Sequence, residues 1–198
     1  MRVVLASRSA ARARLLAAAG VELTIVPADL DEVALREAFA AERLATADAA
    51  IALAEMKARR IAPTLADETI VLGCDQLLDL DGEWLDKPTD RAAARRQLRR
   101  LRGRTHALAT AAVAVRGVSR IWHHVAVPHL ALRDFSDAFL DLYLERAGPE
   151  LLGCVGAYQI EGLGAQLLAS VEGDAFAVQG LPLLPVLEFL RDQGVLMR

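Results

Sequence analysis

Cysteine is scarce in this sequence. Only Cys74 and Cys154 occur among 198 residues, and they form no CxxC pair. A disulfide framework and a structural zinc site are therefore not expected, and a reducing cytoplasm is the expected location. Long apolar runs are also missing, since none approaches the roughly 20 residues that a membrane span requires. We therefore expect no association with a membrane.

The motifs of several large enzyme classes are missing as well. No GxxxxGK[ST] loop occurs, and no GxGxxG follows a strand-like run, which argues against a P-loop and a dinucleotide-binding site. GxSxG and HExxH are also lacking. The four histidines lie in strand-like runs and are expected to be structural or surface imidazoles: His106, His123, His124 and His129.

No charge of one sign dominates the chain. The formal net charge is -3, because acidic residues balance the many arginines. The whole protein therefore has no field that would attract nucleic acid, and any basic function must be local. Apolar residues make up 54% of the sequence, enough to bury a core. We expect residues 1–198 to form a single domain.

Strand and helix signals alternate along the chain without a linker or repeat. Expected strands cover residues 3–5, 23–26, 69–72, 77–80, 106–115, 121–132 and 167–171. Expected helices cover 11–19, two segments within 31–60, 89–101, a segment beginning near Ser136, and 183–192. The turns "DGEW" and "RGVSR" indicate hairpins. The predicted fold class is α/β, with a mixed central sheet flanked by helices.

The first strand-to-helix junction, "VVLASRSAARARLL", has the character of an anion site. Free N–H groups at the start of a helix, together with the helix dipole, attract phosphate. Ser7 and Ser9 could donate hydroxyl hydrogens, and Arg12 offers a planar fork for bidentate contact. The alternative is a capping serine and a solvated basic face, which we favour for Arg8 and Arg14. For Ser7 and Arg12 both interpretations stay open.

A second polar cluster surrounds the stretch "TIVLGCDQ". Asp75 follows an apolar run, and the ends of such strands are where open α/β sheets place ligands. With Gly73 permitting close approach, this carboxylate could bind a divalent cation or accept a proton from water, although it could equally cap a turn. Glu32 follows another short strand. Lys57 and Lys87 are the only lysines, which favours a need for compact ammonium groups there.

These residues resemble the Maf family of nucleoside triphosphate pyrophosphatases along nearly the whole chain. The family opening L-A-S-x-S-P-R-R is similar to "LASRSAAR", with Ala10 for the proline and Ala11 for the first arginine. "DE" at residues 31–32, the helix lysine Lys57, "GCDQ", "DKP" and "GLPLLPVLEFL" resemble further family motifs.

The resemblance implies a two-lobed α/β fold with a sheet-lined cleft, in which water attacks a nucleoside triphosphate with the help of a divalent metal. The products are a nucleoside monophosphate and pyrophosphate. Glu32 and Asp75 would hold Mg²⁺ or Mn²⁺, and Asp75 would also orient or deprotonate the water. The triphosphate would be held by Ser7, Arg12, Lys57 and Lys87. A homodimer is consistent with the resemblance, although no motif fixes it.

The stretch "CVGAYQIEGLG" resembles the family branch that acts on 7-methyl-GTP, because it carries Cys154 and Glu161-Gly162 where the dTTP and UTP branch has lysine and glutamine. A carboxylate can accept two hydrogen bonds from the N1–H and amine of guanine, and N7 methylation makes this base cationic. Glu161 could instead be an exposed turn acid or a metal ligand. Trp84 and Tyr158 could stack on a purine, but such residues more often pack in a core.

The expected partner is therefore a small nucleotide, and the expected role is removal of non-standard nucleotides from the cellular pool. Two alternatives are kept. One is a dTTP or UTP pyrophosphatase of the same family, which Glu161 opposes. The other is a non-catalytic nucleotide-binding regulator of cell division, which the alanine at position 11 favours and the retained lysines and carboxylates oppose.

Overall fold

The computed structural model describes residues 2–198, which form an eight-stranded mixed sheet. The strand order is β2-β1-β3-β5-β7-β8, with β4 paired to β3 and β6 paired to β5. β1 lies parallel to β2 and β3, and the other pairs are antiparallel. The strands are β1 Val3–Leu5, β2 Thr24–Ile25, β3 Ile70–Leu80, β4 Glu83–Leu85, β5 Thr105–Arg116, β6 Ser119–Ala126, β7 His129–Leu132 and β8 Leu168–Glu172. The predicted mixed α/β fold is confirmed.

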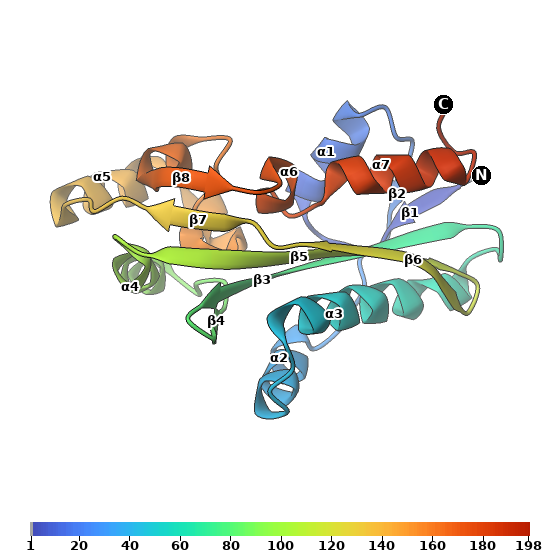
Figure 1. Cartoon of the computed structure of the whole chain (residues 1–198), viewed down its shortest axis with the longest axis horizontal. Coiled ribbons are helices and arrows are strands. Elements are labelled where there is room, and N and C mark those ends of the chain that lie inside the picture. The colour runs from blue at the N-terminus through green and yellow to red at the C-terminus, as the bar shows by residue number, and fades with distance from the viewer. Residues whose placement is uncertain (1) are drawn as a thin grey trace.

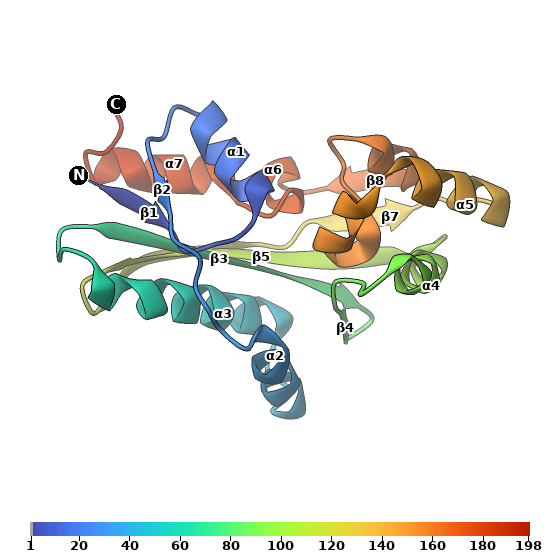
Figure 2. The same cartoon turned by 180° about the vertical axis from the view of Figure 1, so that it is seen from behind.

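Helices cover both faces of this sheet. The helix α3 lies along one face, whereas α1 and α7 lie on the other (Figures 1 and 2). The helices are α1 Ala10–Ala18, α2 Glu32–Ala41, α3 Thr46–Ile61, α4 Arg91–Leu101, α5 Asp137–Arg146, α6 Ala175–Val178 and α7 Leu183–Asp192. Short 3-10 helices are η1 Ala62–Thr64, η2 Pro149–Gly153, η3 Val155–Ala157 and η4 Leu163–Leu167. Within the described chain, no helix combines the length and apolar character that a membrane crossing needs.

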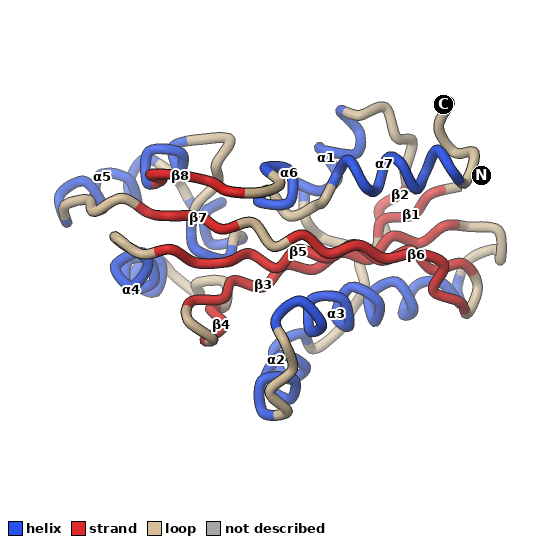
Figure 3. The backbone as a smooth tube through the Cα atoms, in the orientation of Figure 1, coloured by secondary structure: helices blue, strands red, loops and turns tan. Residues whose placement is uncertain are grey.

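Two long central strands, β3 and β5, run through the middle of the molecule (Figure 3). Their apolar side chains alternate between the two faces, as strand geometry requires. Val71 packs with α3 residues, and its neighbour Leu72 packs with the cluster around α7. At the far end, Leu78 joins a third cluster together with α4 and α5. The two strands therefore contribute to every apolar cluster of the protein.

The predicted break between strands at 69–72 and 77–80 is wrong. "GCDQ" is part of one continuous strand, because Gly73 pairs with Val113 and Gln76 pairs with Thr110 of β5. The expected single run 121–132 is also wrong, since Pro128, which has no N–H, lies between β6 and β7. The expected hairpins, the two helices within 31–60 and the C-terminal helix are confirmed.

Position 73 must be glycine because no larger residue would fit at this point of the sheet. A Cβ atom at this position would lie 1.9 Å from the carbonyl oxygen of Ala54 and 2.9 Å from the nitrogen of Ala58. Both atoms belong to the backbone of α3, which therefore approaches β3 closely. We expected Gly73 to admit a ligand, but the structure shows that it admits this helix instead. This close contact brings the residues of α3 between Ala54 and Ala58 near the centre of the sheet.

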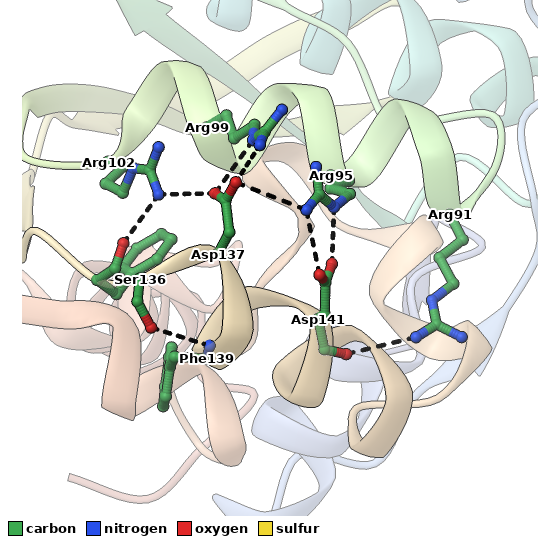
Figure 4. Close-up of polar contacts among 9 residues, drawn as sticks. Arg91, Arg95, Arg99, Arg102, Ser136, Asp137, Phe139 and Asp141 are labelled. Carbon is green, nitrogen blue, oxygen red and sulfur yellow. Dashed lines mark hydrogen bonds and ion pairs between the residues drawn. The ribbon is translucent and has the colours of Figure 1, made fainter.

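An arginine and aspartate ladder joins α4 to α5 (Figure 4). Arg95 Nε lies 2.7 Å from Asp141 Oδ1, and Asp137 is paired with Arg99 and, at 2.9 Å, with Arg102. The arginine of each pair is partly exposed, so each pair alone contributes little stability. Together they align α5 with α4, beside the 3-10 segments that follow α5.

Candidate active site

A cleft of about 590 Å³ opens between the start of α1, the middle of β3, and the 3-10 segment that follows α5. Every side chain predicted for the site lines it: Ser7, Arg12, Glu32, Lys57, Asp75, Lys87 and Glu161. None of the four histidines does, and His106 is buried while His123 and His129 are exposed. The structural or surface interpretation of the histidines is confirmed.

Lys57 lies between two carboxylates. Its Nζ is 2.5 Å from Asp75 Oδ1 and 2.9 Å from Glu32 Oε1. The side chains of Lys57 and Asp75 are only 7% and 4% exposed, whereas that of Glu32 is 30% exposed. Close packing of α3 against Gly73 brings Lys57 to this position. Loss of either partner would leave a poorly compensated buried charge.

Asp75 lies in the middle of β3, opposite Ala111 of β5, and not at a strand end. The predicted strand-end position and the turn-capping alternative are therefore both wrong, because the continuous pairing of β3 with β5 extends past Asp75. Its Oδ2 is buried and has no hydrogen-bond partner among residues 2–198. An unpartnered carboxylate oxygen is costly unless a cation, a water or a ligand satisfies it.

Glu32 is the first residue of α2, whose N-cap is Asp31. The Asp31 side chain accepts a hydrogen bond from Ala34 N and so fixes the start of the helix. Burial opposes ionisation of Glu32, but the charge and hydrogen bond of Lys57, aided by Lys87 and Arg36, lower the pKa of Glu32 below its usual value. Glu32 therefore faces the cleft as a carboxylate.

The start of α1 combines capping with a buried arginine. Ser9 is the N-cap and accepts from Arg12 N. The Arg12 guanidinium donates to the carbonyl oxygens of Gly180 and Cys74, each at 2.7 Å, and to Ser7 Oγ at 3.2 Å. Ser7 Oγ also accepts from Ser9 N, so its own hydrogen remains available to the cleft. Arg12 thus connects the start of α1 to the segments that contain Cys74 and Gly180, and it also lines the cleft.

Lys87 reaches the cleft from the loop after β4 and forms no hydrogen bond or ion pair in the described chain. Desolvation by the surrounding protein, followed by the nearby charges of Arg12 and Lys57, lowers its pKa, although Glu32 and Asp75 oppose this. Two cations, Arg12 and Lys57, and two carboxylates, Glu32 and Asp75, therefore surround the ammonium of an exposed residue, and the cations repel it. An anionic ligand would relieve this repulsion.

Arg8 and Arg14 are exposed, as predicted, yet both line the cleft. Arg8 is 3.5 Å from Asp29, and Arg14 Nη2 is 3.8 Å from Glu161 Oε1. Ala11, where the family has arginine, also lines the cleft.

The segment between η3 and η4 carries Tyr158, Gln159 and Glu161 to the cleft. Tyr158 is buried in the core around α4 and also lines the cleft. Trp84 does not line it; its Nε1 donates to Thr46 Oγ1 at 2.9 Å, and its ring packs beside α3. The expectation that Trp84 could face a base is therefore wrong, and its core alternative is correct.

Sequence reasoning missed Gln76 as a member of the site. Its Nε2 donates to Thr110 Oγ1 and to Ala177 O, each at 2.9 Å. These bonds join β3 and β5 to α6, close to the Gly180 carbonyl that holds Arg12. The signal was available, because Gln76 directly follows Asp75 in the motif "GCDQ".

Comparison with known proteins agrees with this geometry. Residues 2–193 match the family described as Maf-like protein. A nucleoside triphosphate pyrophosphatase of Rhodospirillum rubrum is 53% identical over 196 residues, which cover 98% of this chain and 96% of the relative. One of Paramagnetospirillum magneticum is 50% identical over 194 residues, covering 98% and 100%. A 7-methyl-GTP pyrophosphatase of Brucella abortus biovar 1 is 42% identical over 191 residues, covering 96% of each chain. The chain belongs to the Maf family.

Proposed function

We propose that this protein is a metal-dependent nucleoside triphosphate pyrophosphatase with a preference for 7-methyl-GTP. Family membership and the names of its relatives support pyrophosphatase activity. The observation that carries the proposal is the cleft itself, in which cationic donors surround a buried aspartate that has one oxygen unpaired. Hydrolysis of a polyphosphate needs charge neutralisation and an oriented water, and this arrangement offers groups for both.

The triphosphate would bind along the start of α1 and the two lysines. Ser7 offers a hydroxyl hydrogen, and Ala10 and Ala11 at the start of α1 line the cleft. Lys87, which lacks an anionic partner in the described chain, would contact phosphate directly. Lys57 would exchange part of its contact with Glu32 and Asp75 for a phosphate oxygen.

A divalent cation fits the two carboxylates. Asp75 Oδ2 is unpaired and buried, and Glu32 is ionised nearby. No group of three or more histidine, cysteine or acidic side chains suited to a metal occurs in residues 2–198. Mg²⁺ commonly takes one or two carboxylates and completes its shell with substrate phosphates and water, so two are sufficient. When bound, the ion would supply charge neutralisation at the phosphates.

Asp75 would orient the attacking water and accept its proton. The water oxygen forms a bond to the α-phosphorus, and the bond from this phosphorus to the bridging oxygen of the β-phosphate breaks. Pyrophosphate leaves with the electron pair of that bond, and its charge would be held by Lys87 and Arg12. The products are a nucleoside monophosphate and pyrophosphate.

Glu161 would recognise the nucleotide base through hydrogen bonds. Its carboxylate lines the cleft and lies 3.8 Å from Arg14, so it is a loosely paired anion rather than a locked one. The N1–H and amine of guanine present two donors to a carboxylate, and methylation at N7 adds a positive charge. The name of the Brucella relative gives independent support.

Pyrophosphate release from 7-methyl-GTP, GTP, dTTP, UTP and CTP with Mg²⁺ or Mn²⁺ tests the proposal. We expect the fastest release from 7-methyl-GTP. A preference for dTTP or UTP would keep the activity and reject the role of Glu161. No release from any nucleotide would favour a binding protein and would make Ala11→Arg the first variant to examine.

Location and assembly are part of the same proposal. Both cysteines are free thiols, which suits a cytoplasmic protein. A homodimer, which light scattering of the purified protein would test, is also proposed from the family resemblance.

A further inference from the structure

A buried histidine and tyrosine pair lies directly behind the cleft wall. His106 Nε2 is 2.6 Å from Tyr158 Oη, and the two rings meet edge to face with centroids 5.8 Å apart. His106 is 2% exposed and Tyr158 is 5% exposed. Tyr158 lines the cleft, whereas His106 does not. His106 therefore touches the site only through Tyr158.

This hydrogen bond links two atoms that have no other partner. Tyr158 Oη and His106 Nε2 bond only to each other within the described chain, and which atom donates depends on the tautomer of the imidazole. His106 Nδ1 is buried and unpartnered within residues 2–198. Burial, with a smaller contribution from His129, lowers the pKa of His106 to about 4, and burial raises the pKa of Tyr158. The pair is therefore neutral.

The backbone before Tyr158 is strained. Gly156 has a φ of 82° and Ala157 has a φ of 57°, which is unusual for a residue with a Cβ. A Cβ at Gly156 would lie 2.5 Å from Tyr158 Cε1, so the tyrosine ring packs directly on this turn. Tyr143 Oη donates to the carbonyl oxygen of Ala157 at 2.9 Å. Two tyrosine hydroxyls thus hold a conformation that the local sequence does not favour.

This turn directly precedes Gln159 and Glu161, which line the cleft. We propose that His106 is a positioning residue, which by holding the Tyr158 hydroxyl fixes the strained turn and thereby the wall of the cleft that receives the nucleotide base. This inference rests on the proposed function. It assigns His106 to base recognition and leaves the chemistry at the phosphates to other residues.

Three variants test the inference. Tyr158→Phe removes one oxygen, His106→Leu removes the polar partner of Tyr158, and His106→Gln restores a polar partner that can donate or accept. His123→Gln, at an exposed histidine outside the cleft, is the matched control. For each, binding of the α,β-methylene analogue of GTP and of inorganic tripolyphosphate is measured by calorimetry, together with KM and kcat for 7-methyl-GTP.

We expect Tyr158→Phe and His106→Leu each to weaken analogue binding and to raise KM by about three- to tenfold, which is the effect of one neutral hydrogen bond. The affinity for tripolyphosphate and the kcat should each change by less than about twofold. His106→Gln should recover part of the loss, and the double variant should lose no more than either single one. Circular dichroism reports whether each variant is folded.

Equal losses for the analogue and for tripolyphosphate would overturn the inference, as would unchanged analogue binding in Tyr158→Phe. If His106→Leu does not fold, the Tyr158→Phe measurement still decides. A wild-type protein that binds the analogue but releases no pyrophosphate would refute the proposed activity alone. A wild-type protein that binds no nucleotide would refute both.

Discussion

At the scale of single residues, Asp75 holds one carboxylate oxygen against Lys57 Nζ and leaves the other without a hydrogen bond among the described residues. This asymmetry suits a group that must be held in place and must also act on a ligand. Lys57 holds Oδ1 in the free protein, and Oδ2 is left for a ligand of the cleft that Asp75 lines. A carboxamide would keep the shape of the side chain and lose its charge and basicity.

We expect Asp75→Asn to fold and to lose at least about a hundredfold in kcat, because general-base contributions are commonly of this size. Pyrophosphate release measures the activity, and circular dichroism measures folding. The exposed Asp67→Asn, outside the cleft, is the control. Activity near that of the wild type in Asp75→Asn would remove Asp75 from the chemistry.

Glu161→Gln should reduce kcat/KM for 7-methyl-GTP by about ten- to a hundredfold, because a hydrogen bond to a charged group is lost. Turnover of UTP should change little, since uracil lacks the paired donor edge. Both nucleotides should be assayed with one preparation of each protein. Glu172→Gln, at an exposed residue, is the control variant. Equal losses on the two nucleotides would contradict the base-reading role.

The acid sensitivity of the fold should depend on His106. Its folded pKa of about 4 lies below the ordinary value of 6.5, so the unfolded chain binds more protons between these pH values. Stability should therefore fall as the pH drops from 6.5 to 4, by up to about 1.4 kcal/mol per pH unit from this group. Urea unfolding across this range should show a smaller decline for His106→Gln than for the wild type. A decline of the same size would exclude His106 as the cause.

At the scale of elements, the contact between α3 and β3 positions the site. Ala54 and Ala58 of α3 lie against Gly73, and Lys57 of the same helix thereby reaches Asp75. The hydrogen bond of Lys57 thus depends on a glycine two residues from its partner.

Gly73→Ala should destabilise the protein by about 1–3 kcal/mol, the usual cost of overpacking, because the new methyl group meets backbone atoms that cannot rotate away. Activity should fall as well, since α3 must shift. Chemical denaturation measures the first effect. Gly82→Ala, at a turn where an added Cβ meets nothing within 4 Å although φ is 85°, reports the cost of backbone strain alone.

The sequence predicted most elements, because apolar periodicity and caps such as Ser9 and Ser136 are local signals. It failed at "GCDQ", where small and polar residues interrupt the apolar pattern but pairing with β5 continues the strand. The residues of the proposed site were predicted individually, from local motifs and from the family resemblance. Their contacts were not, because the Lys57 ion pairs and the His106 hydrogen bond join segments far apart in the chain.

At the scale of the whole molecule, β3 and β5 serve all three apolar clusters. Asp75 lies near the middle of β3, so the proposed general base sits on a strand that packs in all three clusters. The cleft walls, by contrast, come from the start of α1 and from short 3-10 segments. The cleft therefore combines a floor on a long central strand with walls formed by shorter segments.

Metal and nucleotide should bind cooperatively. In the free protein Lys57 contacts both Glu32 and Asp75, so a cation arriving alone must compete with the ammonium. A nucleotide offers Lys57 a phosphate and frees the carboxylates. We expect the α,β-methylene analogue of GTP to raise Mn²⁺ affinity by about tenfold or more, a common size for such coupling. Calorimetric titration of Mn²⁺ with and without the analogue measures this, and equal affinities would contradict it.

The ammonium of Lys57 would thus occupy the space between the two carboxylates until a metal ion and a nucleotide bind. On this proposal, free magnesium or free phosphate alone would bind more weakly than the two together, because each meets only part of what the site requires. The protein would then respond mainly to nucleotides that arrive already bound to a metal ion.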